Sequence, residues 1–279
     1  MNRRKLNRKY GVAYWKDIQQ LAKQGDAKAQ YNLGLGYQSG LVPGKKANLK
    51  KAAEWFRKAV HGLRNDVEQG DPEIHKFLGD CYEDGRGVKQ DRKEAVKRYR
   101  KAVKLWQTAA KHGAAMAQFQ LGLIYINGRG VRKDDEQAVK YFRMAAEQGD
   151  AVAQLNLGVN YSTGEGVRKN SNEAVKWYRK AADQGEAIAQ TLLGDCYADG
   201  EGVRKNNQEA VKWYRKSAHQ GTRAGQFKLG RCYEFGQGIK QDHRKAVKWY
   251  RLAAQQNHRA AKDSLARCCE YSRSEGYVA

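Results

Sequence analysis

The chain has 279 residues, of which 41% are hydrophobic and 10% aromatic, and it carries 53 Lys and Arg against 30 Asp and Glu. Aromatic residues supply material for a packed core, and no segment has the roughly 18 apolar residues that a membrane helix needs, so the composition argues against disorder and against a membrane span. The net charge of +23 directs attention to acidic partners: nucleic acid, acidic proteins or anionic membrane surfaces.

The first segment, residues 1–10, is basic and polar and has no apolar core of a secretory signal. We expect it to be a mobile N-terminus. Residues 11–25 resemble the second helix of the unit described below, without a first helix before it, and we expect an N-terminal capping helix there. Five Cys is an odd number in a chain that is long enough to fold without cross-links, which favours a reducing compartment and predicts a cytoplasmic protein.

One sequence unit then repeats along most of the chain. Its first Gly lies at residues 25, 70, 113, 149, 185 and 221, so the period is 36 residues in the second half of the chain and longer before that. Each copy also contains a Leu-Gly pair that is followed three residues later by a tyrosine: Tyr37, Tyr82, Tyr125, Tyr161, Tyr197 and Tyr233. Six copies in one register predict a repeat array over residues 26–257.

Each unit predicts two helices joined by a glycine turn. In the fourth copy Asp150 suits the N-cap of a first helix, and Gly164 can adopt the positive φ that ends it. The second helix is marked by residues 173–182 and ends at Gly185. Gly158 lies inside the first helix at a cost of up to about 1 kcal/mol against Ala. Because every copy repeats this glycine, we expect the two helices to approach closely there.

The first two units are longer than the others by nine and seven residues. The extra seven residues of the second unit lie between Tyr99 and Gly113, which predicts a second helix longer by nearly two turns, or about 10 Å. In the first unit two extra residues lie in the turn and seven follow Phe56, with His61-Gly62 as a candidate helix break. The lengthened helices are either a harmless variation or a docking ledge. After the array, residues 258–279 resemble a first helix and predict a C-terminal capping helix and tail.

The 36-residue period, the Leu-Gly-x-x-Tyr motif, the Gly-x-Gly-Val turn and the near absence of Pro resemble the Sel1-like repeat family, over about residues 25–257. This resemblance implies an all-α fold, an α/α superhelical solenoid of about six helix-turn-helix repeats with capping helices at both ends. It also implies a role as adaptor or scaffold for protein complexes. A cysteine-rich branch of the family that binds or hydrolyses penicillin has paired cysteines in each repeat, and those pairs are absent here.

No motif predicts catalysis, a metal site or a cofactor. Four cysteines share one repeat position, and stacked helices lie roughly 8–10 Å apart, too far for disulfides, so we interpret them as small core residues: Cys81, Cys196, Cys232 and Cys268. The six His have no zinc-ligand spacing, and no nucleophile, base and metal ligands converge. We therefore expect a protein that is not an enzyme and has no small-molecule substrate.

Positions between the core residues of the first helices differ from copy to copy. In related solenoids the first helices line a concave groove, so these residues are the candidate partner-binding groove: Tyr31, Phe119, Gln120, Leu155, Asn156, Thr191, Phe227 and Lys228. We expect the groove to bind an acidic protein surface or an extended peptide. Variable residues on a constant frame are where the choice of partner can reside.

A second candidate surface is basic, and its rival function is nucleic-acid binding, alone or as a subunit of a nucleoprotein complex. Residues 1–60 hold 14 Lys and Arg against three acids, or +11, and the second helices of the second to sixth units each carry a Lys and an Arg three residues apart. The basic surface comprises Arg3, Arg4, Lys5, Arg8, Lys9, Lys45, Lys46, Lys50, Lys51, Arg57, Lys58, Lys97, Arg100, Lys140, Arg143, Lys176, Arg179, Lys212, Arg215, Lys248 and Arg251. Glutamates one turn earlier can pair with the helical lysines, so a solvated helix face is the alternative interpretation.

Overall fold

The structure is a computed structural model that describes residues 12–274, and within that range it contains helices and turns but no strand. This confirms the all-α prediction. The helices are α2 (Val12–Lys23), α3 (Ala27–Ser39), α4 (Leu49–Asn65), the 3-10 turn η1 (Asp66–Gln69), α5 (Pro72–Asp84), α6 (Arg92–Lys111), α7 (Ala115–Asn127), α8 (Asp135–Glu147), α9 (Ala151–Thr163), α10 (Ser171–Asp183), α11 (Ala187–Asp199), α12 (Asn207–His219), α13 (Arg223–Phe235), α14 (His243–Ala254) and α15 (Arg259–Ser274). The basic candidates Arg3, Arg4, Lys5, Arg8 and Lys9 lie outside the described residues.

Local capping chemistry sets the ends of each hairpin. Asp150 accepts a hydrogen bond from the backbone N–H of Ala153 at 2.7 Å and begins α9, and Asn170 accepts one from Glu173 at 3.1 Å and begins α10. Gly164 ends α9 with φ +84°, a conformation that favours glycine. The predicted caps of this unit are therefore confirmed.

The glycine within each first helix permits close packing of the hairpin, as predicted. A Cβ on Gly158 would lie 2.6 Å from the ring of Tyr178, and one on Gly122 would lie 2.5 Å from the ring of Phe142. The same glycine–aromatic contact joins the two helices in every repeat, since Gly34 meets Phe56, Gly79 meets Tyr99, Gly194 meets Tyr214 and Gly230 meets Tyr250. The aromatic residue of the second helix thus occupies the space that a Cβ would need.

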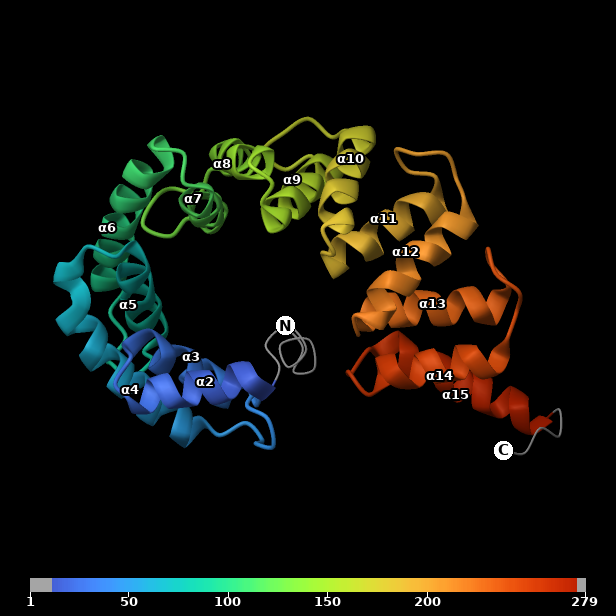
Figure 1. The fold of residues 1–279 in the computed structure, drawn as a ribbon, viewed down its shortest axis with the longest axis horizontal. Coiled ribbons are helices and arrows are strands. Elements are labelled where there is room, and N and C mark those ends of the chain that lie inside the picture. Colours follow the sequence, from blue (N-terminus) through green and yellow to red (C-terminus); the bar gives the residue numbers. More distant parts are fainter. Residues whose placement is uncertain (1–11, 275–279) are drawn as a thin grey trace. The chain divides into compact units, whose positions relative to one another are not determined.

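The array divides into two compact units, residues 1–148 and 149–279. In the first unit α3, α5 and α7 follow one another along the inner side of a curved stack, and α4 and α6 lie on its outer side (Figure 1). Trp15 of α2 packs with Leu33 and Val42 at one end of this unit. In the second unit, Ala261 and Cys268 of α15 pack on Tyr250 of α14.

Helices α4 and α6 have 17 and 20 residues, whereas the other second helices have 12 or 13. Tyr99 and Trp106 of α6 are both buried, so the longer helix keeps one apolar side. The candidate break at His61-Gly62 was wrong, because α4 continues to Asn65. Gly62 packs against α3 instead: a Cβ there would lie 2.7 Å from the Cβ of Ala27.

Candidate protein-interaction surfaces

Three of the predicted groove residues are interior. Tyr31, Leu155 and Thr191 occupy the same repeat position, three residues before the helical glycine, and are only 2%, 8% and 6% exposed. The Thr191 hydroxyl shares a hydrogen bond of 2.7 Å with Ser217 of the following helix. A partner therefore finds little of these side chains to contact.

Phe119 and Phe227 hold this same position and are half-buried. The ring of Phe119 lies 5.9 Å from that of Phe142, and Phe227 stacks on His258 at 4.5 Å. Gln120, Asn156 and Lys228 lie one residue closer to the glycine, and all three are half-exposed. Of the predicted groove residues, Phe119, Phe227, Gln120, Asn156 and Lys228 are therefore the ones that are partly open to a partner.

Sequence reasoning missed a second variable position, the residue directly after the helical glycine. It lies three residues beyond the position of Gln120 and Asn156, so both positions share one face of the first helix. This spacing was the signal that could have identified it. The residues are Leu35, Asp80, Leu123, Val159, Asp195 and Arg231; Asp80 is buried, Arg231 exposed and the others half-exposed.

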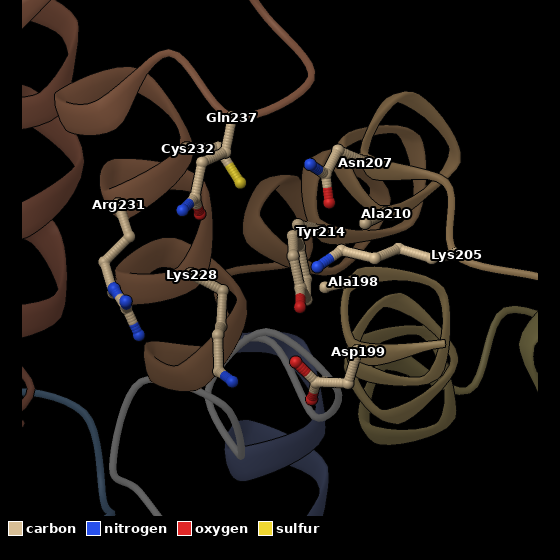
Figure 2. A pocket seen from close by; sticks show the side chains of 10 residues that line it. All are labelled: Ala198, Asp199, Lys205, Asn207, Ala210, Tyr214, Lys228, Arg231, Cys232 and Gln237. Carbon is tan, nitrogen blue, oxygen red and sulfur yellow. The ribbon is translucent and has the colours of Figure 1, made fainter. Parts of the chain in front are cut away.

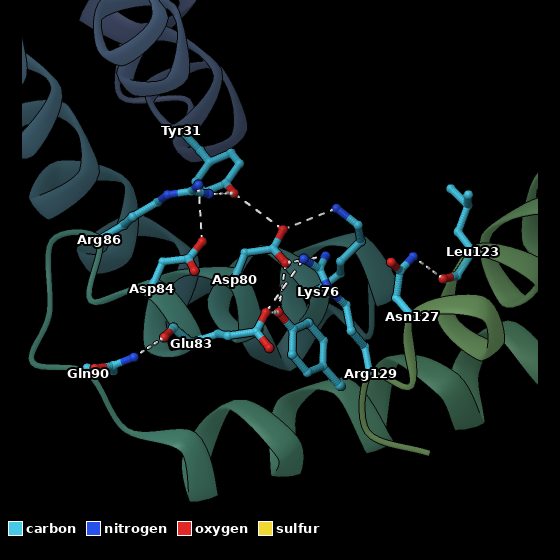
Figure 3. Close-up of polar contacts among 11 residues, drawn as sticks. Tyr31, Lys76, Asp80, Glu83, Asp84, Arg86, Gln90, Leu123, Asn127 and Arg129 are labelled. Carbon is cyan, nitrogen blue, oxygen red and sulfur yellow. Dashed lines mark hydrogen bonds and ion pairs between the residues drawn. The ribbon is translucent and has the colours of Figure 1, made fainter. Parts of the chain in front are cut away.

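Asp80 is the centre of a polar network in the first unit (Figure 3). Its carboxylate accepts hydrogen bonds from the hydroxyls of Tyr31 at 3.3 Å and Tyr99 at 2.8 Å. It also accepts one from Lys76 at 3.2 Å and one from Arg129 at 3.0 Å. Burial, followed by the negative charge of Asp80, raises the pKa of both tyrosines, so that they remain protonated donors.

Two arginines of the glycine turns connect this network across repeats. Arg86, in the turn of the second repeat, donates to the Tyr31 hydroxyl of the first repeat at 3.1 Å. Arg129, in the turn of the third repeat, donates to Asp80 of the second. Since buried charges are tolerated where they are paired and hydrogen-bonded, the arrangement joins neighbouring repeats and does not free any group for catalysis.

The second unit contains a cavity of about 190 Å³ between α11, α12 and α13 (Figure 2). Asp199, Lys205, Lys228 and Arg231 are among its lining side chains. Lys228 is occupied by an ion pair with Asp195, at 2.6 Å. Drug-sized ligands occupy pockets of roughly 300–1,000 Å³, so this cavity is smaller than such a ligand needs.

The cysteines have the environment of core residues. Cys81 and Cys232 are buried and Cys196 is half-buried, and all are free thiols. Burial raises the pKa of the Cys81 thiol to about 12 and those of Cys196 and Cys232 to about 11, which disfavours the nucleophilic thiolate. Over the described range, no group of His, Cys, Asp and Glu could hold a metal ion, and no helix is long and apolar enough to span a membrane.

The basic candidates within residues 12–274 lie on the surface. Lys45, Lys46, Lys50, Lys51, Arg57 and Lys58 are exposed, as are the helical lysines Lys97, Lys140, Lys176, Lys212 and Lys248; Arg143 and Arg179 are half-buried, and Arg100, Arg215 and Arg251 are exposed. Three of the predicted glutamate–lysine pairs form, with Glu94–Lys97 at 3.6 Å and Glu173–Lys176 at 2.6 Å, together with Glu209–Lys212. In the second unit, Lys176 and Lys212 are therefore neutralised locally.

The model of the Sel1 repeat matches residues 27–61, 75–113, 115–150, 151–186, 187–222 and 223–258. The chain belongs to the Sel1 repeat family. Repeats of this kind generally mediate contacts between proteins. The described helices and their hairpin packing agree with the solenoid fold of this family.

Two solved structures of bacterial proteins are similar to this Sel1 repeat chain. One is c5321, a protective antigen of uropathogenic Escherichia coli, with 36% identity over 92% of this chain and a TM-score of 0.64. This chain spans about half of that protein, 52% of its length. The other is a Sel1 repeat protein of Oxalobacter formigenes, with 34% identity, a TM-score of 0.60, and coverage of 77% of this chain and 86% of that one. Among curated proteins none matches this chain.

Proposed function

We propose that this Sel1 repeat protein is a non-catalytic scaffold or adaptor that binds an acidic protein or an extended acidic peptide. The observation that carries the proposal is the inner face of the first helices. Around the constant Leu-Gly frame, the half-exposed residues at two positions change from repeat to repeat, as Gln120, Leu123, Asn156 and Val159 illustrate. The net charge of +23 supports a partner of opposite charge.

A matched pair of double variants tests the proposal. Asn32→Asp with Gln120→Glu adds two carboxylates to the inner face of the first unit, at the same position of two repeats, with almost no change in shape. Asn172→Asp with Gln208→Glu makes the same chemical change at two exposed residues outside it. Proteins captured from the native cell are identified by mass spectrometry, and the purified partner is then titrated against both variants.

We expect the inner-face variant to bind the partner at least tenfold more weakly, since an added like charge opposes each contact, and the control to bind within twofold of the original chain. Equal affinity of the two variants would contradict the inner face as the binding surface.

The cysteines support our placement of the protein in a reducing compartment, the cytoplasm, because Cys81, Cys196 and Cys232 are free thiols.

The rival function is nucleic-acid binding through the exposed basic residues of the N-terminal part and the second helices. Because such binding releases counterions, affinity for labelled RNA or DNA falls steeply with salt, by tenfold or more between low and physiological ionic strength. An acidic protein surface gives a shallower salt dependence. A purified chain that carries no excess absorbance at 260 nm and ignores both nucleic acids at low salt removes this rival.

A further inference from the structure

Helix α6 differs from the other helices of the described chain in its charge. Its 20 residues contain eight Lys and Arg and a single acid, Glu94. The buried side consists of Ala95, Tyr99, Ala102, Val103, Trp106 and Ala110. The opposite side exposes Lys93, Lys97, Arg100, Lys101, Lys104 and Lys111, which we call the α6 ridge.

The members of the α6 ridge follow one another mostly at intervals of three or four residues, and therefore form one face of the helix. At about 1.5 Å per residue, the ridge from Lys93 to Lys111 is about 27 Å long. The seven residues that lengthen α6 contribute to the length of the ridge, because they lie within the segment between Tyr99 and Gly113 that contains Lys104 and Lys111. The corresponding segment of the shorter second helices, such as that between Tyr178 and Gly185, is seven residues shorter.

Most of the ridge lacks a neutralising partner. Glu94 is engaged by Arg98 at 2.7 Å and by Lys97 at 3.6 Å. Among residues 12–274, no carboxylate lies within 4.0 Å of Lys93, Lys101, Lys104 or Lys111. Lys97 pairs with Glu94 in the same way as Lys176 of α10 and Lys212 of α12 pair with a glutamate one turn earlier, so the uncompensated charge of α6 lies in its other lysines.

The charge of α6 also affects a neighbouring helix. His75 of α5 is buried, and its pKa is lowered first by burial and then by the charges of Lys101, a member of the ridge, and of Arg98, which pairs with Glu94. A positive potential attracts an anionic partner and accelerates its association.

The chemistry of the ridge favours a protein over a nucleic acid. The aromatic rings of α6, Tyr99 and Trp106, are buried and offer no surface on which bases could stack. The helix also packs on α5 and α7, so that its outer side is the one that exposes the ridge.

We infer that the α6 ridge is a docking surface for an acidic segment of a partner protein, a run of Asp and Glu side chains that extends over about 27 Å. The inference rests on the proposed function in one respect, the acidic character of the partner. It adds a second surface, on the outer side of the first unit, to the inner face proposed above. The residues that lengthen α6 then have a function, because they form part of the surface that contacts the partner.

The test uses the full chain and a fluorescent 20-residue oligoglutamate as the probe, in about 50 mM salt. The ridge variant is Lys101→Gln with Lys104→Gln and Lys111→Gln. The control variant removes the same charge from exposed lysines of the second unit: Lys169→Gln with Lys240→Gln and Lys248→Gln. A single-stranded DNA of equal charge is titrated in parallel, and circular dichroism verifies that both variants keep their helices.

We expect the ridge variant to bind oligoglutamate about tenfold more weakly than the original chain, which corresponds to about 0.5 kcal/mol for each of three lost ion pairs, and the control to change by less than threefold. Equal losses of affinity in the two variants would overturn the ridge as the docking site, but not the proposal that the partner is acidic. If the original chain does not bind oligoglutamate, both the ridge and the acidic partner are overturned. Tighter binding of DNA, lost in the ridge variant alone, would assign the ridge to nucleic acid and overturn the inference.

Discussion

The guanidinium of Arg129 donates a hydrogen bond to the carboxylate of Asp80 at 3.0 Å, and thereby joins the turn of the third repeat to the first helix of the second. The two residues are 49 positions apart in the chain. Asp80 is buried and receives donors from three repeats, whereas Asp195, at the same repeat position in the second unit, is half-exposed. Asp80 and Asp195 therefore allow the effect of Asp→Asn to be compared between a buried and a half-exposed site.

We predict that Asp80→Asn lowers the free energy of unfolding by about 3 kcal/mol, because it removes the negative charge that compensates Lys76 and Arg129 in a buried site. The carboxylate of Asp195 accepts a hydrogen bond from Tyr214 and pairs with Lys228. We therefore expect Asp195→Asn to lower the free energy of unfolding by only about 1 kcal/mol. Urea unfolding followed by circular dichroism measures both. Equal losses would show that the network around Asp80 contributes no more than an ordinary surface contact.

The glycine–aromatic contact predicts an inverted effect of alanine in a helix. Alanine normally stabilises a helix by about 1 kcal/mol relative to glycine. At Gly122 its Cβ would lie 2.5 Å from Phe142, so we expect Gly122→Ala to destabilise the protein by about 1–2 kcal/mol. In a chain that also carries Phe142→Leu, the added methyl group has more space, so Gly122→Ala should destabilise that chain less. Thermal unfolding of the original chain, the two single variants and the double variant measures this coupling. If Gly122→Ala alone stabilises the protein, the close approach is refuted.

His75 predicts sensitivity to acid. Its ring is fully buried, and neither nitrogen has a hydrogen-bond partner among the described residues. Burial and the nearby cations lower its pKa in the folded chain, opposed only in part by Asp71. Above pH of about 6.5 both the folded and the unfolded chain hold a neutral ring, and there is no effect. As the pH falls below this value the unfolded chain takes up a proton that the folded chain resists, so stability decreases.

A conservative variant isolates this effect. The other five repeats have glutamine at the position of His75: Gln30, Gln118, Gln154, Gln190 and Gln226. Gln118, for example, donates to the carbonyl of Ala110 at 3.2 Å. We expect His75→Gln to reduce the loss of stability between pH 7 and pH 5, measured as the shift of the urea midpoint. An identical pH dependence in the two chains would exclude His75 as its source.

The cysteine environments predict an order of alkylation. Cys81 is fully buried with a thiol pKa raised to about 12, whereas Cys196 is half-exposed with a pKa raised to about 11. Iodoacetamide should therefore modify Cys196 well before Cys81 in the folded chain, because reaction requires access and the thiolate. Peptide mass spectrometry of timed samples gives the order, and the difference should vanish in urea. Faster modification of Cys81 would contradict its place in the core.

Hairpin architecture was predictable because its causes are local. The caps Asp150 and Asn170 and the turn glycine Gly164 act within a few residues of themselves, so the sequence pattern indicates where α9 and α10 begin and end. The prediction of a helix break at Gly62 was wrong because it too considered only the neighbouring residues in the chain. Its conformation is helical because α3 approaches it at Ala27, a contact that residues near Gly62 do not reveal.

The sequence by itself determined the family, the number of repeats and the position in each hairpin where the two helices approach closely, since a periodic pattern repeats whatever holds one hairpin together. Only the tertiary structure decided which variable residues a partner can reach. Tyr31 and Thr191 became interior because neighbouring helices cover them, through contacts with residues such as Asp80 and Ser217 that lie 49 and 26 positions away. It also decided that the lysines of the α6 ridge lie exposed along one outer face, because exposure and pairing depend on what packs beside a helix.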